Sequence, residues 1–536
     1  MKMSNRKNIS DYPVIHRSTC AALITLSFVA NAKEIVSQNQ PNILFLLSDD
    51  AGYNDWGFQG SADFKTPQID RLAKSGVFCT NGYVSASVSG PSRAGLLTGR
   101  YQQRFGYFMN PSDTDVLPKS ETTIADALKK LGYYTGIIGK WHMGFPEQYQ
   151  PNNRGFDYFY GFLSGSRSYY PLPASTNATT LFNNRLRYNK QALDETKMSF
   201  YTTDLFTDKA IEFMDESKSK NKPFFLYLSY NAIHGPLNAL DDDKLPYLGL
   251  TDQVRRTTGG MTASLDKSFG KLLDYLEKNG LRENTLVVWV NDNGGEKSEM
   301  HANNWPLRDQ KGSEYEGGIR VPIVFSMPNT LPQNQEYNSS VISLDLFPTF
   351  VKLAGGDPST NPNILDGADL MPYLKAEKTN EPHDYLFWQR NNAAVRKGDW
   401  KLIELNTKGG IFELYNLKND IGEKVNQLNN YPQIVTELRA KLVEWKQLHN
   451  QATALPTTEY DDLYRKVVYP NPFEHIVSFM SNDGHYRILD IAGKELQKGI
   501  TTQGLNSLNL GFLHSGSYFL QTADDKKGKT LKIIKY

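Results

Sequence analysis

Between residue 41 and about residue 349, short apolar runs alternate with stretches of helical periodicity, and this alternation constrains the fold more than any other feature of the sequence. Uninterrupted apolar runs are typical of strands that are buried on both faces of a parallel sheet. Such runs occupy residues 42–47, 135–138, 224–228 and 286–290. Helical patterns lie between them, for example at 124–131 and 265–279, each followed directly by a glycine. The sequence therefore predicts an α/β fold with a mostly parallel sheet sandwiched by helices.

The rest of the chain predicts further folding units, because 536 residues exceed what a single core organises. Residues 394–403 and 412–417 read as paired strands, and a helix with apolar residues at helical spacing follows them. Beyond a polar linker, short alternating strands separated by glycine-containing turns predict a β-sandwich. The expected divisions are an N-terminal leader (1–32), the α/β domain (33–384), a small α+β subdomain (385–449), the linker (450–466) and the β-sandwich (467–536).

The balance of charge excludes one class of partner. The chain has 59 basic and 58 acidic residues, so it lacks the bulk positive charge that attracts nucleic acid. An anionic ligand must instead be held by a local group of cations.

The N-terminus and the cysteines indicate export without disulfide bonds. Basic residues up to Arg17 precede an apolar run at 20–29 and the tripeptide 30–32, Ala-Asn-Ala, which together are typical of a secretory signal peptide at 1–32. The apolar run is too short to span a bilayer. With only Cys20 and Cys79, the chain has no disulfide framework, and we expect Cys79 to be a small buried apolar residue.

A serine stands where a helix is expected to begin. The run Ser-Gly-Pro-Ser-Arg at 89–93 continues to Thr-Gly at 98–99, and Pro91 suits the first helical position. Ser89 would then lie at the positive end of the helix dipole, which favours an anionic nucleophile. The run resembles the first signature of the formylglycine-dependent sulfatases (type I, serine-type), whose fold is alkaline-phosphatase-like. The resemblance implies that Ser89 is oxidised to formylglycine (3-oxoalanine), which acts as the nucleophile.

Acidic pairs follow two of the predicted strands. Asp49 and Asp50 come after the first strand, and Asp292 and Asn293 come after the strand that ends at 290. Ligands bind beyond the carboxyl ends of parallel strands, and adjacent carboxylates stay ionised when they share a cation. Oxygen donors of this kind suit Ca²⁺, with Mg²⁺ as the alternative. The resemblance implies that these four residues and an oxygen of modified Ser89 share one ion.

Further cationic residues match other elements of the same family. Gly-Lys-Trp-His at 139–142 resembles the second sulfatase signature, and His234 and Lys311 match the third and fourth cationic elements. The resemblance implies that Arg93 holds the nucleophile and that Lys140 and Lys311 neutralise the sulfate. It also implies that His234 protonates the leaving oxygen, with Lys311 as the alternative, and that His142 removes a proton from the nucleophile to expel sulfate.

Substrate contacts are less constrained by the sequence. The aromatic segments 156–160 and 167–170 suit either sugar stacking or core packing, and both interpretations stay open. His301, Trp305 and Arg308 lie between the second acidic pair and the fourth cationic element, so we expect them to border the pocket. Replacing His301 or Arg308 should then raise KM for a sulfated oligosaccharide.

The C-terminal segment resembles the sorting domain of type IX secretion. It contains Tyr-Pro-Asn-Pro-Phe at 469–473, Ile-Leu-Asp-Ile-Ala-Gly-Lys-Glu-Leu at 488–496 and a basic, apolar stretch at 531–536. The alternative is a carbohydrate-binding sandwich. The resemblance implies secretion through the type IX machinery, with release or attachment to the cell surface both open. A serine at 89 in a type IX substrate also implies maturation by a radical-SAM type enzyme.

Taken together, these features predict a secreted sulfatase, a sulfuric ester hydrolase, that acts on a sulfated algal polysaccharide or oligosaccharide. The candidate glycans are ulvan, carrageenan and fucoidan, with ulvan first. Two alternatives remain: a phosphoesterase of the alkaline phosphatase superfamily that uses unmodified Ser89, and a catalytically inactive secreted glycan-binding protein.

Overall fold

The computed structural model describes residues 40–110, 116–173, 183–405, 410–452, 468–469, 475–481, 484–501, 504–524 and 528–535. The chain divides into two compact units, residues 1–449 and 450–536. The signal peptide predicted at 1–32 and most of the linker predicted at 450–466 lie outside the described residues. Within the described part of the chain, no helix is both long and apolar enough to cross a bilayer.

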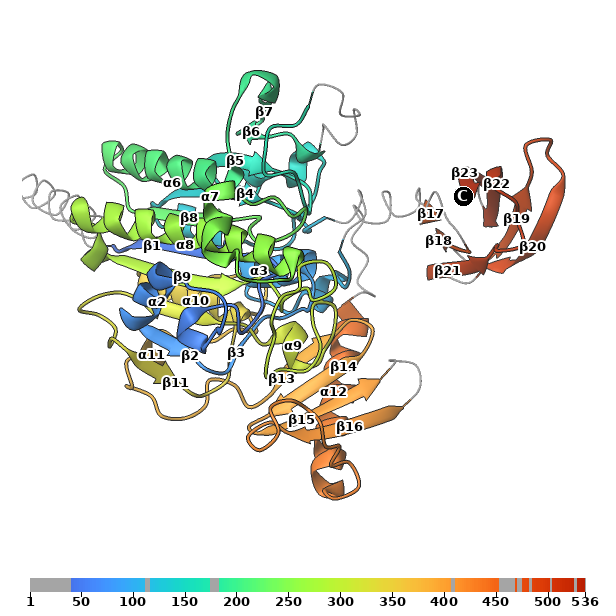
Figure 1. The fold of residues 1–536 in the computed structure, drawn as a ribbon. Coiled ribbons are helices and arrows are strands. Elements are labelled where there is room, and N and C mark those ends of the chain that lie inside the picture. The colour runs from blue at the N-terminus through green and yellow to red at the C-terminus, as the bar shows by residue number, and fades with distance from the viewer. Residues whose placement is uncertain are drawn as a thin grey trace, which may run out of the picture. The chain divides into compact units, whose positions relative to one another are not determined.

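A 10-stranded sheet forms the centre of the first unit (Figure 1). β1 (Asn42–Ser48) pairs in parallel with β8 (Phe224–Ser229) and β9 (Thr285–Asn291), and β4 (Tyr134–Lys140) pairs in parallel with β8 and β5 (Tyr158–Phe162). The apolar runs predicted as strands are β1, β4, β8 and β9, and every residue of these strands is buried. The strand order is β11 (Gln335–Tyr337), β2 (Val77–Cys79), β10 (Ile323–Ser326), β9 (Thr285–Asn291), β1 (Asn42–Ser48), β8 (Phe224–Ser229), β4 (Tyr134–Lys140), β5 (Tyr158–Phe162), β6 (Arg187–Tyr188) and β7 (Gln191–Ala192).

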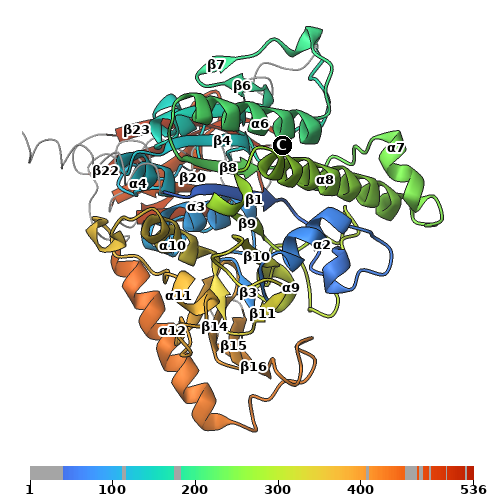
Figure 2. The same ribbon diagram turned by 90° about the vertical axis from the view of Figure 1, so that its left-hand side faces the viewer.

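Helices cover both faces of this sheet, as predicted (Figures 1 and 2). Because successive side chains of a strand point to opposite faces, β1 contributes to two cores. Ile43 and Phe45 pack with α3 (Ser89–Thr98), α4 (Ile124–Lys130) and α10 (Leu346–Leu353). Leu44 and Leu46 pack with α2 (Pro67–Lys74), α6 (Thr202–Ser219) and α8 (Gln253–Lys278). Cys79 is fully buried in the first core, which confirms its expected apolar role.

Helix α8 is longer than the predicted segment 265–279, because it begins at Gln253. Its N-cap is Asp252, whose carboxylate accepts a hydrogen bond from the backbone N–H of Arg255 at 3.1 Å. Gly259 and Gly260 lie within the added turns and lower the helix propensity of that part of the sequence. The first unit also contains these short elements: β3 (Gly82–Tyr83), β12 (Val341–Ile342), α7 (Asp241–Lys244), α9 (Glu316–Ile319) and α11 (Met371–Leu374).

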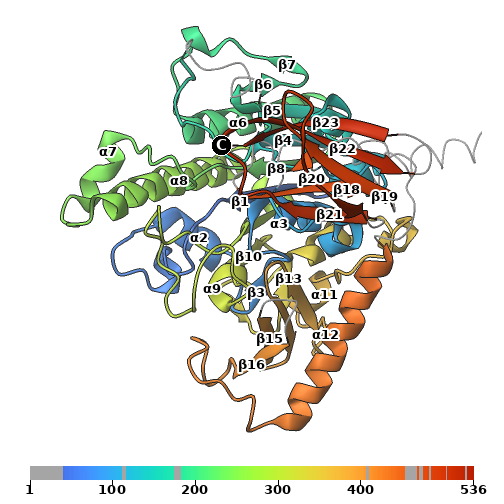
Figure 3. The same cartoon turned by 90° about the vertical axis from the view of Figure 1, so that its right-hand side faces the viewer.

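A small antiparallel sheet and a long helix, α12 (Pro432–Ala452), form the C-terminal subdomain of the first unit (Figure 3). The segment predicted as one strand at 394–403 is a hairpin, because the chain turns at Gly398, whose φ is +52°. The Gly-Asp pair at 398–399 is the turn signal that this prediction overlooked. α12 also extends three residues into the predicted linker. The strands are β13 (Leu386–Gln389), β14 (Ala393–Lys397), β15 (Trp400–Leu405) and β16 (Ile411–Asn416).

The second unit is a pair of antiparallel sheets that share one apolar core, as expected for a β-sandwich. Phe479 of one sheet and Ile488 and Leu520 of the other are buried in this core. The sheets have the orders β17-β18-β21 and β20-β19-β22-β23. Their strands are β17 (Val468–Tyr469), β18 (Ile476–Ser481), β19 (Gly484–Leu489), β20 (Glu495–Thr501), β21 (Gly504–Asn509), β22 (Gly516–Asp524) and β23 (Gly528–Lys535).

Candidate functional site

Four oxygen-bearing side chains meet at the carboxyl ends of β1 and β9. These neighbouring strands are parallel, so the residues that follow them lie side by side. The backbone N–H of Asp50 donates to Asp292 Oδ1 at 3.3 Å, and Asn293 Nδ2 donates to Asp50 Oδ1 at 2.8 Å. Asp49, Asp292 and Asn293 are fully buried, and Asp50 is 2% exposed. The structure thus brings together the two acidic pairs that the sequence places after separate strands.

Ser89 lies against this group. Helix α3 begins at Ser89 itself, not at Pro91 as predicted from the proline. A proline in the first turn of a helix costs no hydrogen bond, because the first four N–H groups have no intrahelical partner. Ser89 still lies at the positive end of the helix, and its Oγ is 3.2 Å from both Asp49 Oδ1 and Asn293 Oδ1.

Each carboxylate of the group has one close cationic partner. The pairs are Lys140 Nζ–Asp49 Oδ2 at 2.6 Å, Lys311 Nζ–Asp50 Oδ2 at 2.6 Å and Arg93 Nη2–Asp292 Oδ2 at 2.9 Å. His234 is a second neighbour of Asp50, with its Nε2 at 3.4 Å from Asp50 Oδ2. The three carboxylates and the three cations cancel, so a bound divalent cation would leave a net positive charge for an anionic substrate.

Arg93 fixes several parts of the site at once. Its Nε also donates to Asp292 at 3.2 Å, its Nη2 lies 3.4 Å from Asp49, and its Nη1 donates to Ser229 Oγ. Ser229 in turn donates to the carbonyl oxygen of Lys140 at 2.7 Å. Burial alone would lower the pKa of Arg93, but the charge of Asp292 and its other anionic neighbours raise it. The guanidinium therefore stays charged and rigid.

At the two aspartates after β1, nearby cations affect the pKa more strongly than burial does. Burial alone would raise the pKa of Asp49, but Lys140 and His234 lower it below its ordinary value. The pKa of Asp50 is lowered in the same way, by His234 and Lys311 against burial. Burial lowers the pKa of Lys140, whereas Asp50 and Asp49 outweigh burial and raise that of Lys311. The aspartates are thus held ionised.

His142 lies just beyond β4 and is 8% exposed. Its Nδ1 is buried and has no hydrogen-bond partner among the described residues. Burial, with the charges of Lys140 and Arg93, lowers the pKa of His142 well below its ordinary value. The ring packs against Gly165, where an added Cβ would stand 2.6 Å from His142 Nε2. The site therefore contains a neutral imidazole with a free ring nitrogen.

The donor set fits a metal ion. Ser89 Oγ, Asp49 Oδ1 and Asn293 Oδ1 crowd together although only one hydroxyl proton is available to bond them. Oxygen atoms that converge in this way are typical ligands of a hard cation. Asp49, Asp50 and His234 each offer a ligand atom within 4.8 Å of the others, so this group can bind a metal.

Two of the three residues expected to border the pocket, His301 and Arg308, bond elsewhere. His301 Nδ1 pairs with Asp252 Oδ2 at 2.6 Å. Arg308 donates to Tyr415 Oη and to the carbonyl oxygen of Glu423, both at 2.9 Å, in the C-terminal subdomain. The described contacts do not bring either side chain to the carboxylates, and their role in substrate binding stays a prediction.

The aromatic segments mainly build the core, except Tyr170, which is 39% exposed and leaves the stacking interpretation open for that residue. The aromatic side chains of 156–160 are at most 5% exposed, which favours core packing over sugar stacking. Arg167 is occupied by an ion pair with buried Glu195 at 2.7 Å. Tyr169 is also buried, but its hydroxyl donates to the carbonyl oxygen of His234 at 2.9 Å. This support of the His234 loop has no signal in the sequence.

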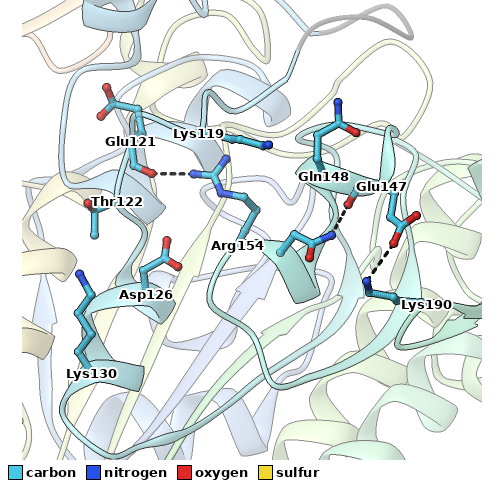
Figure 4. Close-up of a pocket in the computed structure, with 10 residues that line it drawn as sticks. Lys119, Glu121, Thr122, Asp126, Lys130, Glu147, Gln148, Arg154 and Lys190 are labelled. Carbon is cyan, nitrogen blue, oxygen red and sulfur yellow. Dashed lines mark hydrogen bonds and ion pairs between the residues drawn. The ribbon is translucent and has the colours of Figure 1, made fainter. Parts of the chain in front are cut away.

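A polar cavity of about 690 Å³ is lined by other residues (Figure 4). Several of its charged groups have partners of their own: Glu147 pairs with Lys190 at 2.9 Å, and Arg154 donates to the carbonyl oxygen of Glu121 at 2.7 Å. The lining residues are Lys119, Glu121, Thr122, Asp126, Lys130, Glu147, Gln148, Asn153, Arg154 and Lys190. None of the residues grouped around Ser89 lines this cavity.

Comparison with known families agrees with this geometry. Residues 41–356 match the sulfatase family, and residues 307–448 match the family described as N-sulphoglucosamine sulphohydrolase, C-terminal. Residues 467–536 match the secretion system C-terminal sorting domain. The second unit is therefore a sorting domain of the type IX system.

Individual proteins that resemble this chain include sulfatases. The sulfatase YdeN of Escherichia coli (strain K12) is 32% identical over 415 residues, which cover 66% of this chain and 70% of YdeN. The N-acetylgalactosamine-6-sulfatase of Mus musculus is 30% identical over 406 residues, which cover 72% of this chain and 76% of that enzyme. The crystal structure of Ps i-CgsB in complex with k-i-k-neocarrahexaose is 36% identical, with a TM-score of 0.72, and covers 80% of this chain and 97% of that one.

Proposed function

Because this chain belongs to the sulfatase family and carries a type IX sorting domain, we propose that it is a secreted sulfatase that uses an oxidised Ser89 to hydrolyse a sulfated glycan. The observation that carries the proposal is the position of Ser89. Ser89 lies at the N-terminus of α3, and its Oγ is 3.2 Å from Asp49 Oδ1 and Asn293 Oδ1, which are oxygens of the kind that bind metal ions. The surrounding cations suit a sulfate ester, whose charge grows on its oxygens during cleavage.

Two groups would complete the site: a formylglycine at position 89 and a metal ion. Formylglycine, made from Ser89 by a radical-SAM type maturase, supplies a hydrated aldehyde as nucleophile, and Ca²⁺ supplies positive charge that favours the anionic form of that nucleophile. The residues that would hold the ion are Asp49, Asp50, Asp292, Asn293 and position 89. Their buried, all-oxygen donor set favours Ca²⁺ over softer metals, with Mg²⁺ as the alternative.

The cations bind the sulfate and protonate the leaving group. Lys140 and Lys311, each 2.6 Å from a site carboxylate, would neutralise the sulfate oxygens. His234 is the proposed proton donor to the leaving sugar oxygen. Its Nδ1 lies 2.8 Å from the carbonyl oxygen of Gly235, so the ring is oriented with Nε2 toward Asp50 and the site.

His142 is the proposed base that regenerates the nucleophile. A base must be unprotonated when it acts, and burial lowers the pKa of His142 well below its ordinary value. Its unpartnered Nδ1 leaves one ring nitrogen available to take a proton.

For the substrate, we propose a sulfated algal oligosaccharide and place carrageenan fragments first. The relative at 36% identity is described in complex with a neocarrahexaose, a carrageenan-type hexasaccharide. Ulvan, the first candidate from the sequence, and fucoidan remain as the other members of the test panel.

Sulfate release from oligosaccharides of these three glycans tests the proposal. The wild type should release sulfate from at least one of them, and Ser89→Ala should release none. EDTA should reduce the rate, and added Ca²⁺ should restore it more fully than Mg²⁺. Phosphate release from a phosphomonoester, with no sulfate release from any glycan, would favour the phosphoesterase alternative instead.

A further inference from the structure

Trp305 is unusual among the tryptophans of this chain. All seven tryptophans fall within the described residues, and Trp305, at 70% exposed, is the only one of them that is exposed. An exposed indole forfeits the burial of a large apolar surface, and it presents a flat amphipathic ring to a ligand. Five others, Trp56, Trp141, Trp289, Trp388 and Trp445, are buried.

The backbone of Trp305 is tied to the segment after β1. Its N–H donates to Asn303 Oδ1 at 3.0 Å. The carbonyl oxygen of Asn303 accepts from the N–H of Asn54 at 2.8 Å, and the N–H of Asn303 lies 3.3 Å from both carboxylate oxygens of Asp55. Asn54 and Asp55 closely follow the first two carboxylates of the site.

The preceding residue, Asn304, ties the same loop to two more segments. Asn304 is 2% exposed, and its Oδ1 accepts from the N–H groups of Tyr53 at 3.2 Å and Gly295 at 3.0 Å. Its Nδ2 donates to the carbonyl oxygens of Gly295 at 2.9 Å and Asp309 at 3.1 Å. Gly295 follows the second acidic pair, and Asp309 leads to Lys311. Trp305 is thus held at the junction of three segments that carry site residues.

We propose that Trp305 is a stacking platform for a pyranose ring of the glycan, next to the sugar whose sulfate is removed. The inference rests on the sulfatase function proposed above. An indole offers a flat apolar face to the C–H groups of a sugar ring and loses little conformational freedom on binding. The anchored loop would orient that face in advance, which reduces the entropy cost of binding an extended oligosaccharide.

A saccharide fits this position better than a protein partner. Protein interfaces usually need a contiguous apolar patch, with aromatic residues near its centre. Among the described residues, no other large exposed apolar side chain lies between Leu248 and Ile364 in the sequence. The loop before Trp305 is polar instead, with exposed Lys297, Ser298 and Glu299. Within this segment of the described chain Trp305 is the single large exposed apolar side chain, and a lone ring of this kind suits a sugar.

Kinetics with a long and a short substrate test this role. The long substrate is the carrageenan hexasaccharide, or the ulvan or fucoidan oligomer if that releases sulfate faster, and the short one is 4-nitrocatechol sulfate. Trp305→Ala should raise KM for the oligosaccharide about tenfold and leave kcat and the short substrate nearly unchanged. Trp305→Phe should retain part of the effect because it keeps a ring. Ile364→Ala, which truncates another exposed apolar side chain (78% exposed), is the matched control.

A binding measurement separates this inference from the proposed function. In a Ser89→Ala background, calorimetry with the same oligosaccharide should show affinity about tenfold weaker when Trp305 is also replaced by alanine. Normal sulfate release with unchanged KM and affinity in the Trp305 variants would overturn the inference alone. An equal loss with the short substrate would also overturn it, because it would indicate a damaged site. Failure of the wild type to release sulfate from any oligosaccharide would overturn the proposed function and this inference with it.

Discussion

Replacement of Lys401 by methionine should destabilise the first unit more than any surface substitution. Lys401 lies in β15 of the C-terminal subdomain and is fully buried. Its Nζ donates to Glu316 Oε1 of α9 and to Glu423 Oε1, both at 2.9 Å. One ammonium group thus neutralises two buried carboxylates, one of which belongs to the α/β domain. Methionine fills a similar volume without the charge.

The size of the stability loss depends on which partners Glu316 and Glu423 keep when Lys401 is replaced. Glu316 retains Tyr83 Oη at 2.7 Å and Arg320 at 3.3 Å, and the charges of Lys401 and Arg320, against burial, lower its pKa to about 2. Glu423 depends on Lys401 for its cation, and burial already raises its pKa to about 7. Without Lys401, Glu423 must either stay ionised without a partner or take up a proton, and removing one member of a buried ion group in this way costs about 3–5 kcal/mol.

Urea unfolding, followed by tryptophan fluorescence, measures this loss. Lys401→Met should lose about 3–5 kcal/mol, and adding Glu423→Gln should recover part of it by removing the unpaired charge. Lys441→Met, which breaks an exposed pair with Glu444, is the control and should leave the midpoint unchanged. A loss below about 1 kcal/mol for Lys401→Met, or no recovery in the double variant, would mean that Lys401 does not stabilise the two buried carboxylates.

Three further outcomes follow from the structure. Lys311→Met should lower kcat for sulfate release by about 10²–10³-fold in protein that still unfolds cooperatively, and an unchanged kcat would exclude Lys311 from sulfate binding. Gly165→Ala should lower kcat by about 10²-fold, because the new Cβ displaces the ring of His142; a wild-type kcat would mean that the ring has room to shift. Burial alone would lower the pKa of His383, but Asp345, 2.7 Å away, raises it above its ordinary value of 6.5. Protonated His383 therefore stabilises the fold fully below pH 6.5, and this stabilisation is lost as the pH rises through the raised pKa. His383→Gln should reduce the loss of urea stability above pH 6.5, and an unaltered pH profile would contradict this.

The sequence was sufficient to predict the sheet and the meeting of the acidic pairs. Continuous apolar runs identified β1 and β9, and the rule that ligands bind at the carboxyl ends of parallel strands brought Asp49 and Asp292 together. The start of α3 was less well predicted, because Pro91 is equally acceptable at several positions in the first turn. The hairpin at Gly398 was overlooked because its two strands are short and continuous in the sequence.

Contacts between distant segments could not be predicted from the sequence. The support of His234 by Tyr169 and the packing of His142 on Gly165 each join residues from different loops. The positions of such loops depend on tertiary packing, which has no periodic signal in the sequence. The same holds for Asn304, whose side chain ties together three segments of the site.

The mass of the tryptic peptide that contains Ser89, taken from enzyme that releases sulfate, shows whether this serine is the oxidised nucleophile. Ser89 Oγ lies 3.2 Å from Asp49 and Asn293, and we expect the residue to be oxidised there. The active enzyme should therefore give a peptide that has lost two hydrogens relative to the encoded serine, in a fraction that scales with specific activity. A fully active enzyme whose Ser89 peptide has the mass of unmodified serine would exclude formylglycine as the nucleophile.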